Sequence, residues 1–332
     1  MPNPTPARPA PAPLPPLRRV GLGGTGPEDV VFDSSGHLLT GIADGRVLRI
    51  GLPEPGRRDR PADVVEVART GGRPLGLEAL PDGRLLVCDA ERGLLRLDPG
   101  GKADVEVLAD AVAGRPLRFC SNAVAALDGT VYFTVSSRRH GLDDWLSDII
   151  EHRPTGLLAR IAPGGEPEVL LDGLQFANGV ALGPDESYVV VAETGARRLT
   201  RLWLTGADKG RHDILADDLP GFPDNMTRTP RGGFWVALAG PRQPPLEWLH
   251  RAAPRVRRAV AAAARRLPPP PALGGARVVE VDPYGRVVRE LRGRGYRMVT
   301  GVAEHGGRLA LGSLQEGAVA WCDLGEPATT AV

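Results

Sequence analysis

Residues 74–98 read PLGLEALPDGRLLVCDAERGLLRLD, and this stretch decides the fold class. Three short apolar segments alternate with two turns, Pro81-Asp82-Gly83 and Glu91-Arg92-Gly93. The glycine that ends each turn can adopt the positive φ that a tight hairpin needs. The segments between the turns are short and apolar throughout, which is the pattern of strands covered on both faces. The stretch therefore predicts a small antiparallel sheet packed between two neighbours.

Segments of the same kind recur along the chain. Their first residues lie at 28, 75, 121, 178, 224 and 300, a spacing near 47 residues with two longer gaps. A strand repeat of this length is typical of a β-propeller. A doubly wound α/β fold is excluded because amphipathic helices of about 10–15 residues are missing between the strands. We therefore predict an all-β fold, a six-bladed β-propeller, with blades at 26–52, 74–98, 104–163, 168–204, 213–282 and 287–324.

The domain organisation follows from this repeat. We expect a Pro-rich N-terminal arm at 1–20, one propeller domain at 21–326 and a tail at 327–332. A strand near 18–21 is expected to complete the last blade, because ring closure leaves only short, protected sheet edges. Two longer excursions interrupt the blades, one at 138–154 and one in blade five. The excursion at 138–154 is expected to be a lid element near the substrate entrance.

The insertion in blade five, residues 241–275, is predicted to be helical. Apolar residues recur at near-helical spacing between Leu246 and Leu267, and residues 252–267 carry five arginines. The favoured interpretation is a helical cap over the channel mouth with its arginines in solvent. The alternative is contact of 246–267 with an anionic membrane or an acidic partner, which no charge excess elsewhere in the chain supports.

Composition limits the possible partners. The chain is 42% hydrophobic and 24% charged, with a formal net charge of +1, so nothing indicates binding to nucleic acid. No apolar run is long enough to cross a bilayer, and the Pro-rich start does not resemble a signal peptide. The three cysteines lack metal-site spacing and are expected to be core thiols. We expect a cytoplasmic protein with a small-molecule substrate; the sequence leaves its oligomeric state open.

Three polar residues stand at the same register of the repeat: Glu28, Asn178 and Asp224. Equivalent positions of successive blades converge on the central channel, so these side chains are expected to meet there. Buried carboxylates are destabilising unless they are paired or bound to a metal, and no Lys or Arg occupies an equivalent position. We therefore predict one cation per chain, with calcium favoured and magnesium or manganese as alternatives. Zinc is disfavoured because the histidines lack HxH or HxxxH pairing.

A purely structural role for these residues is the alternative. Asp and Asn often cap strand ends or form turns, and any one of these residues alone would fit that role. Three of them at one register favour a shared site. The neighbouring position of blade three adds Asn122 as a further candidate ligand, and we expect Ser121 and Asn225 to contact the substrate.

The chain resembles a known superfamily in several stretches. It is similar to the six-bladed calcium propellers that include gluconolactonase, diisopropylfluorophosphatase and paraoxonase, and most of all to their strictosidine-synthase-like branch. The resemblance spans nearly the whole chain beyond about residue 20, and it is carried by the segments GGRPLGLEALPDGRLLVCDAERGLLRLDP, GRPLRFC, VYFTVSS, EHRPTGLLARI, LLDGLQFANGVALGPDESYVVVAETGARRLTRLWL, LPGFPDNM, GGFWVAL and LALGSL.

The resemblance implies that Glu28, Asn178 and Asp224 bind calcium at the channel floor, joined by Asn225 and the blade-three residue. In hydrolytic members the carboxylate matching Asp224 is also proposed as base or nucleophile. This sequence departs from the family pattern in blade three: Ser121 stands where Asn is usual, and residue 135, where Asp is usual, is a valine.

The expected function is calcium-dependent hydrolysis of a lactone or ester, with Asp224 activating water. One alternative is a condensing enzyme like strictosidine synthase, whose chemistry uses a channel Glu near the start of blade six. The corresponding stretch here, 297–301, has no carboxylate. Another is a binding or scaffold propeller without turnover. If Asp224 proves to be a ligand only, His140 and His305 are the next candidates for a base.

Overall fold

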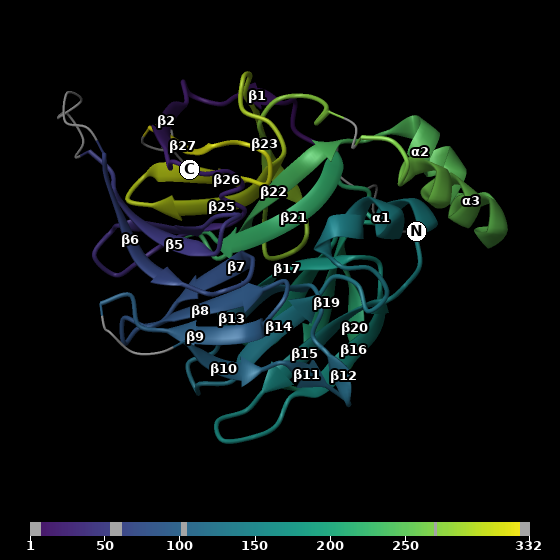
Figure 1. The fold of residues 1–332 in the computed structure, drawn as a ribbon, viewed down its shortest axis with the longest axis horizontal. Helices are drawn as coiled ribbons and strands as arrows, with labels where there is room; N and C mark the ends of the chain where they lie inside the picture. Colours follow the sequence, from purple (N-terminus) through teal and green to yellow (C-terminus); the bar gives the residue numbers. More distant parts are fainter. Residues whose placement is uncertain (1–7, 54–61, 101–104, 269–270, 326–332) are drawn as a thin grey trace.

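The computed structural model describes residues 8–53, 62–100, 105–268 and 271–325. Its strands form six sheets, each with four antiparallel strands, arranged as the blades of a propeller (Figure 1), and one of these sheets carries a fifth, parallel strand at its outer edge. The first strands of the blades contact one another in a closed ring, β3–β7–β13–β17–β21–β25 and back to β3. Each first strand lies at one edge of its sheet. The first strands therefore surround the central channel, which confirms the predicted six-bladed β-propeller.

The strands have the following bounds. Blades one to three contain β3 (Val30–Phe32), β4 (Leu38–Gly41), β5 (Arg46–Gly51) and β6 (Asp63–Arg69); β7 (Pro74–Ala79), β8 (Leu85–Asp89), β9 (Gly93–Leu97) and β10 (Glu106–Ala109); β13 (Cys120–Ala125), β14 (Val131–Val135), β15 (Gly156–Ile161) and β16 (Glu168–Leu174). Blades four to six contain β17 (Ala177–Leu182), β18 (Tyr188–Glu193), β19 (Arg198–Trp203) and β20 (His212–Ala216); β21 (Gly221–Arg228), β22 (Phe234–Pro241), β23 (Arg277–Val281) and β24 (Val287–Arg292); β25 (Val299–His305), β26 (Arg308–Ser313), β27 (Ala318–Asp323) and β2 (Arg18–Gly21).

Blade boundaries differ from the sequence-based ones in a systematic way. The outer strands β10, β16, β20 and β24 were assigned to the blade that follows each of them, and β6 was left out of blade one. In the structure each of these strands pairs with the third strand of the preceding blade. An outer strand is half-exposed and polar, so its sequence lacks the continuous apolar pattern that identified the inner strands.

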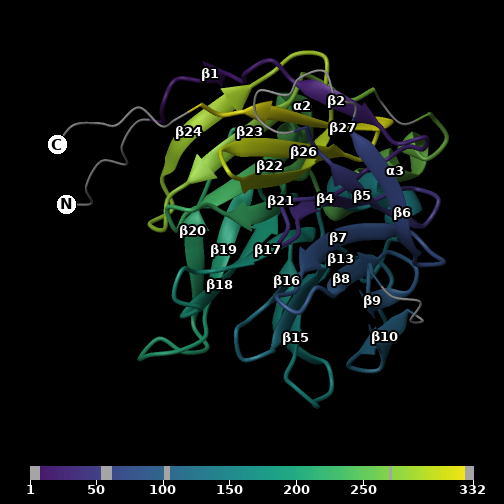
Figure 2. The same ribbon diagram turned by 90° about the vertical axis from the view of Figure 1, so that its left-hand side faces the viewer.

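The N-terminal region closes the ring. Strand β2 pairs antiparallel with β27, with Arg18 opposite Trp321 and Gly21 opposite Ala318. The closing strand was predicted at this position, and the pairing confirms it. A further short strand, β1 (Ala12–Pro13), pairs in parallel with the outer edge of β24 (Figure 2). Residues 1–7 and 326–332, which include the predicted tail, lie outside the described residues.

Six apolar clusters, one between each pair of neighbouring blades, form the core. Every residue of β18 in blade four is buried, because blades three and five cover its two faces. This arrangement explains the continuous apolar runs in the sequence. A seventh cluster lies outside these layers and joins Leu75, Phe119 and Phe176 to Ile149. It lies where the channel opens toward the helices.

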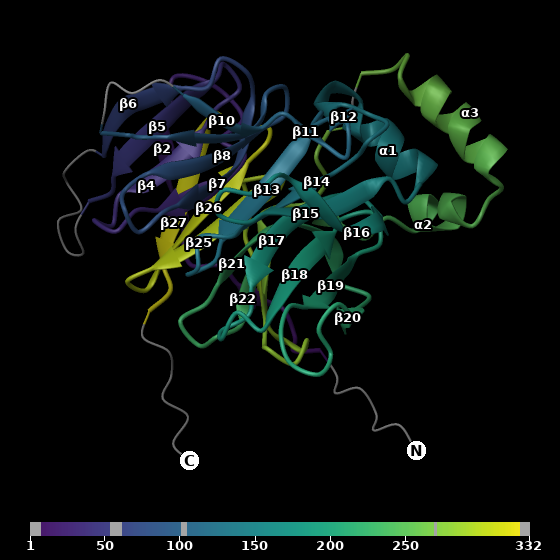
Figure 3. The same cartoon turned by 90° about the horizontal axis from the view of Figure 1, so that it is seen from below.

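The helices of the described residues are short, and α1, α2 and α3 lie on one side of the propeller (Figure 3). A 3₁₀ turn, η1 (Leu142–Asp144), leads into α1 (Trp145–Glu151), and both belong to the excursion in blade three. The insertion in blade five supplies α2 (Pro244–His250) and α3 (Pro254–Ala264), which pack against α1. A small hairpin of β11 (Ala111–Val112) and β12 (Arg115–Pro116) lies in the β10–β13 connection. None of the helices in the described residues has the length and apolarity of a membrane span.

Candidate active site

Bulges in the first strands place the candidate site residues. In blades two to six the pairing register shifts just where the repeat predicted, for example between Cys120 and Ala123 and between Ala177 and Val180. In blade one, Glu28 and Asp29 directly precede β3. A bulge leaves residues out of the ladder and re-aims their side chains. The residues at these positions are therefore free to face the channel.

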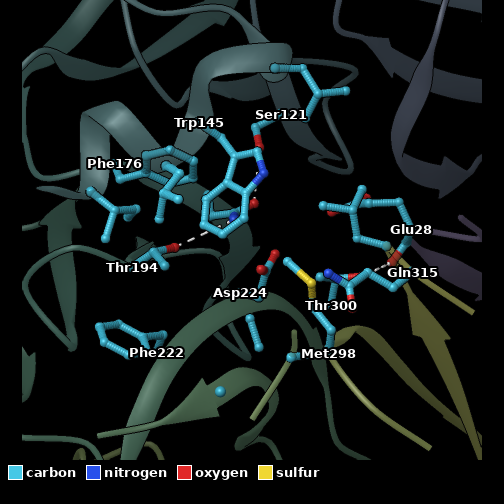
Figure 4. A pocket seen from close by; sticks show the side chains of 18 of the residues that line it. Glu28, Ser121, Trp145, Phe176, Thr194, Phe222, Asp224, Met298, Thr300 and Gln315 are labelled. Carbon is cyan, nitrogen blue, oxygen red and sulfur yellow. Dashed lines mark hydrogen bonds between the residues drawn. The ribbon is translucent and has the colours of Figure 1, made fainter. Parts of the chain in front are cut away.

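Each blade contributes two consecutive residues at this position, and the first residue of each pair lines one cavity. The cavity has a volume of about 150 Å³ and opens toward α1 and the cap. Its floor is formed by Glu28, Leu75, Ser121, Asn178, Asp224 and Thr300, one residue from each blade. Figure 4 labels four of them, Glu28, Ser121, Asp224 and Thr300. The structure thus brings the predicted residues Glu28, Ser121, Asn178 and Asp224 together.

The second residue of each pair alternates between a polar side chain and glycine. Asp29, Asn122 and Asn225 belong to blades one, three and five, while the even blades carry glycine. A Cβ on Gly76 would lie 2.5 Å from the carbonyl oxygen of Ser121. The glycines are thus required where the backbone of the next blade passes, and the polar side chains of the odd blades fill the space beneath the floor.

The hydrogen bonds of Asn122 and Asn225 explain why neither lines the cavity. Asn122 Nδ2 donates to Asp29 Oδ2 at 3.1 Å, and its Oδ1 accepts from the Val180 amide at 3.4 Å. Asn225 Nδ2 donates to both carboxylate oxygens of Glu28, at 3.2 and 3.1 Å. Asn122, predicted as a ligand, is therefore turned away from the cavity. Asn225, predicted to contact substrate, instead holds Glu28 from below.

The floor holds two buried carboxyl groups without an ion-pair partner among the described residues. Glu28 and Asp224 are 5% and 6% exposed. Burial, with Asp224 and Asp29 nearby, raises the pKa of Glu28 well above its usual range, and burial with Asp29 does the same to the pKa of Asp224. The guanidinium of Arg73 opposes the shift at Glu28, but it donates to the carbonyls of Gly26 and Pro74. Arg73 therefore supports the floor from outside.

Two buried oxygen atoms test whether the floor suits a cation. Asp224 Oδ1 and Asn225 Oδ1 have no hydrogen-bond donor. Asn178 Oδ1 accepts from Ser121 Oγ at 2.9 Å, and Asn178 Nδ2 donates to Thr194 Oγ1 at 3.4 Å. Buried oxygens without donors are destabilising unless a ligand satisfies them. Carboxylate and amide oxygens are the donors that calcium prefers, so the residues fit a hard cation.

This donor set relies on amide oxygens as well as carboxylates. Among the residues that the structure describes, no group of three or more His, Cys, Asp or Glu side chains has metal-binding geometry. A site for a soft metal such as zinc, which prefers nitrogen and sulfur ligands, is therefore not indicated. The chemistry of the floor agrees with a calcium-type set of Glu28, Asn178 and Asp224, with Asn225 adjoining it.

Apolar side chains form the walls and the lid. α1 and the turn before it contribute Leu142, Trp145, Leu146 and Ile149, and the cap contributes Leu246 and residues 271–273. Both excursions predicted as lid elements therefore reach the cavity. The helix α3 does not line it, and Val256 and Val260 on α3 remain 43% and 38% exposed.

The two histidines named as further candidate bases lie elsewhere. His140 is held beside Asp144 at 2.8 Å, in the network that ties α1 to Arg265 of the cap. His305 stacks on Phe32 at the far end of β25. Neither lines the cavity. Two residues that line the cavity, Thr194 and Gln315, were not predicted from the sequence. They follow β18 and β26, and they lie outside the repeat register that the floor residues share.

The fold and floor define a class of protein, the six-bladed propellers with a polar channel site. Among solved structures the chain is similar to a gluconolactonase from Xanthomonas campestris, with a TM-score of 0.63, 17% identity, and coverage of 92% of this chain and 88% of the other. That likeness shows the fold alone.

Family models and curated relatives are more specific. Residues 122–207 match the strictosidine synthase model, and residues 14–50 match the N-terminal strictosidine synthase-like model. The chain is 35% identical to the mouse adipocyte plasma membrane-associated protein, covering 88% of this chain and 74% of that protein. It is 33% identical to Arabidopsis thaliana protein STRICTOSIDINE SYNTHASE-LIKE 6, with 90% and 79% covered. The chain belongs to the strictosidine synthase-like family.

Proposed function

We propose that this protein is a calcium-dependent hydrolase that acts on a lactone or an ester. The observation that carries the proposal is the pair of buried carboxylates on the cavity floor, Glu28 and Asp224, of which Asp224 Oδ1 has no hydrogen-bond donor. Two neighbouring carboxylates at the bottom of an apolar cavity are stabilised by a cation and gain nothing from an uncharged lining. The gluconolactonase fold is consistent with this chemistry.

The chemistry needs few groups. Calcium bound at the floor would polarise the substrate carbonyl and stabilise the developing oxyanion. The Asp224 carboxylate would accept the proton of the water that attacks the carbonyl carbon, through the oxygen that is not bound to the cation. The bond from that carbon to the alcohol oxygen then breaks, and the proton passes from Asp224 to the departing alkoxide. The products are a carboxylic acid and an alcohol, joined in one hydroxy acid if the substrate is a lactone.

The remaining floor residues would hold this pair in place. Asn225 fixes both oxygens of Glu28, and Thr300 Oγ1 donates to the Glu28 carbonyl at 2.6 Å. Ser121 orients the amide of Asn178 through its hydrogen bond to Oδ1. These contacts come from different blades, so the floor is as rigid as the propeller itself.

Condensation of an amine with an aldehyde is less well supported by the site. Such a reaction needs an acid or base near the start of blade six, where the cavity is lined by Met298. A scaffold without turnover would require neither the two buried carboxylates nor the buried oxygen atoms that lack a hydrogen-bond donor.

A panel of lactones and aryl esters, assayed with calcium and with chelator, tests the proposal. We expect hydrolysis that chelator abolishes and added calcium restores. Asp224→Asn should lose turnover, while Asp82→Asn, a control at an exposed turn, should keep it. Hydrolysis that is indifferent to chelator, or no hydrolysis of any substrate by the calcium-loaded protein, would refute the proposal.

A further inference from the structure

A second ring of residues stands above the floor. The residue two positions before each floor residue occupies the same place in its blade, and the six are Gly26, Arg73, Phe119, Phe176, Phe222 and Met298. The four from blades three to six are large and apolar, and all four line the cavity. Figure 4 shows Phe176, Phe222 and Met298 around Asp224. One side of the cavity is therefore a continuous apolar wall built from consecutive blades.

Three of these wall residues have strained backbones. Phe119, Phe176 and Met298 have φ angles of 78°, 58° and 49°, in the left-handed region that favours glycine. Holding a bulky residue there costs on the order of 1–3 kcal/mol. Glycine would relieve this strain, and blade one does carry a glycine, Gly26, at φ 68°. Strain of this kind persists at functional sites because the side chain placement serves a purpose.

The surrounding backbone keeps the two strained phenylalanines in place. The Phe119 amide donates to the Ala90 carbonyl at 2.9 Å, and its carbonyl accepts from the Ser136 amide at 3.1 Å. The Phe176 carbonyl accepts from the Thr194 amide at 3.1 Å. The two rings meet edge to face at 5.4 Å. Their positions are thus fixed before any ligand arrives, which lowers the entropic cost of binding against them.

Apart from the proposed cation site, the lining lacks a partner for an anionic substrate group. Among the described residues that line the cavity there is no Lys, Arg or His, and the only ionisable side chains are Glu28 and Asp224. The guanidinium of Arg73 lies outside the cavity, bound to two carbonyls. An anionic substituent or a row of sugar hydroxyls against this wall would lose its hydration without gaining hydrogen bonds.

We infer that the substrate is a neutral ester or lactone that carries one ring-sized apolar group, seated against Phe119, Phe176 and Phe222 under the lid residue Trp145. The inference rests on the proposed hydrolysis for the reacting group, and on the wall for the rest of the molecule. An apolar cavity of about 150 Å³ holds one benzene-sized ring, so a cavity of this volume limits the apolar group to a single ring.

Binding and turnover are measured separately on the calcium-loaded protein. The binding probes are two ketones that cannot be hydrolysed, 2-phenylcyclopentanone and cyclopentanone, titrated by calorimetry. Burial of the added ring predicts about 10- to 100-fold tighter binding of the phenyl compound. The turnover arm compares γ-phenyl-γ-butyrolactone, γ-butyrolactone and glucono-δ-lactone, and we expect the highest kcat/KM for the phenyl lactone.

Variants assign the effect to the wall. Phe222→Ala should reduce the preference for the phenyl compound about tenfold in both binding and turnover. Phe222→Leu keeps a large apolar side chain and should retain most of the preference, so it shows whether a loss in Phe222→Ala comes from the missing wall or from a folding defect. Ile214→Ala removes a large apolar side chain from an exposed strand and serves as the matched control. We expect it to leave the preference unchanged.

The outcomes separate the two claims. Phenyl-selective binding without turnover of any lactone or aryl ester supports this inference and refutes the proposed hydrolysis. Turnover with glucono-δ-lactone preferred supports hydrolysis and overturns the inference. Equal binding of the two ketones, or a phenyl preference that Phe222→Ala and Phe222→Leu both leave intact, also overturns it.

Discussion

Replacing Gly179 by alanine tests how closely the blades approach beneath the candidate site. A Cβ at this position would lie 2.6 Å from the Asp224 carbonyl oxygen, 2.7 Å from Asn225 Cα and 2.7 Å from the Met226 nitrogen. All three atoms belong to the backbone of β21, so no side chain can rotate out of the way. Real Cβ atoms essentially never approach within 3.0 Å. The strands β17 and β21 must therefore separate by several tenths of an ångström.

The magnitude follows from two opposing effects. Overpacking of this kind costs about 1–3 kcal/mol, while removing a glycine from the unfolded chain gives back about 0.4–1 kcal/mol. We expect Gly179→Ala to lower the free energy of unfolding by about 1–2 kcal/mol. For a chain of this size that lowers Tm by about 1–3 °C. The affinity for calcium should fall as well, because the displaced segment carries Asp224.

The control is Gly141→Ala. Gly141 has no heavy atom within 4 Å of its ideal Cβ, and its φ of −83° suits any residue. This variant should match the wild type or slightly exceed its stability. Thermal unfolding with and without calcium measures both changes. A Gly179→Ala protein as stable as Gly141→Ala, with unchanged calcium affinity, would show that blades four and five do not meet as closely as described.

Three further predictions concern the site and its lid. Asp224→Asn keeps an oxygen ligand but loses the base, so calcium should stay bound while kcat falls by about 10²–10⁴-fold. The activity of Glu28→Gln should instead follow metal occupancy and recover partly when calcium is added. If added calcium restores the full activity of Asp224→Asn, Asp224 is a ligand only. Deleting 243–273 and joining the ends with a short linker should leave a folded propeller by circular dichroism but broaden substrate selection; aggregation would show that the cap covers core. Burial, the stacked His250 and a nearby arginine lower the pKa of His152 to about 4. Protonation of this histidine therefore favours the unfolded state, and the free energy of unfolding should fall as the pH drops from about 6.5 to 4. His152→Phe should lose less stability than the wild type over that pH range, and equal losses would contradict the assignment.

Much of the floor could be predicted from the sequence because it follows a repeat. Every blade presents its first strand to the same channel, so a register found in one blade predicts the floor residue of all the others. Glu28, Asn178 and Asp224 lie together for that reason. The predicted closing strand was found for a similar reason, since a ring of sheets needs a partner for its last edge.

Other features depended on information that the register does not contain. Whether a side chain at a bulge faces the cavity or the space beneath it depends on local backbone geometry, so Asn122 was expected among the ligands and points instead to Asp29. The strained conformations of Phe119 and Phe176 are likewise invisible in a sequence, because phenylalanine there reads as ordinary core. A search at two positions before each floor residue would have found the wall.

Metal content measured together with thermal unfolding tests the central claim most directly. Protein purified without chelator should contain about one calcium per chain by elemental analysis. Because a ligand bound only by the native state stabilises it, calcium at about 100 times its Kd should contribute about 2.7 kcal/mol. Removing it with chelator should lower Tm by about 3–5 °C, and Glu28→Gln should shrink that shift. A protein without bound metal, whose Tm neither calcium nor chelator changes, would contradict the account.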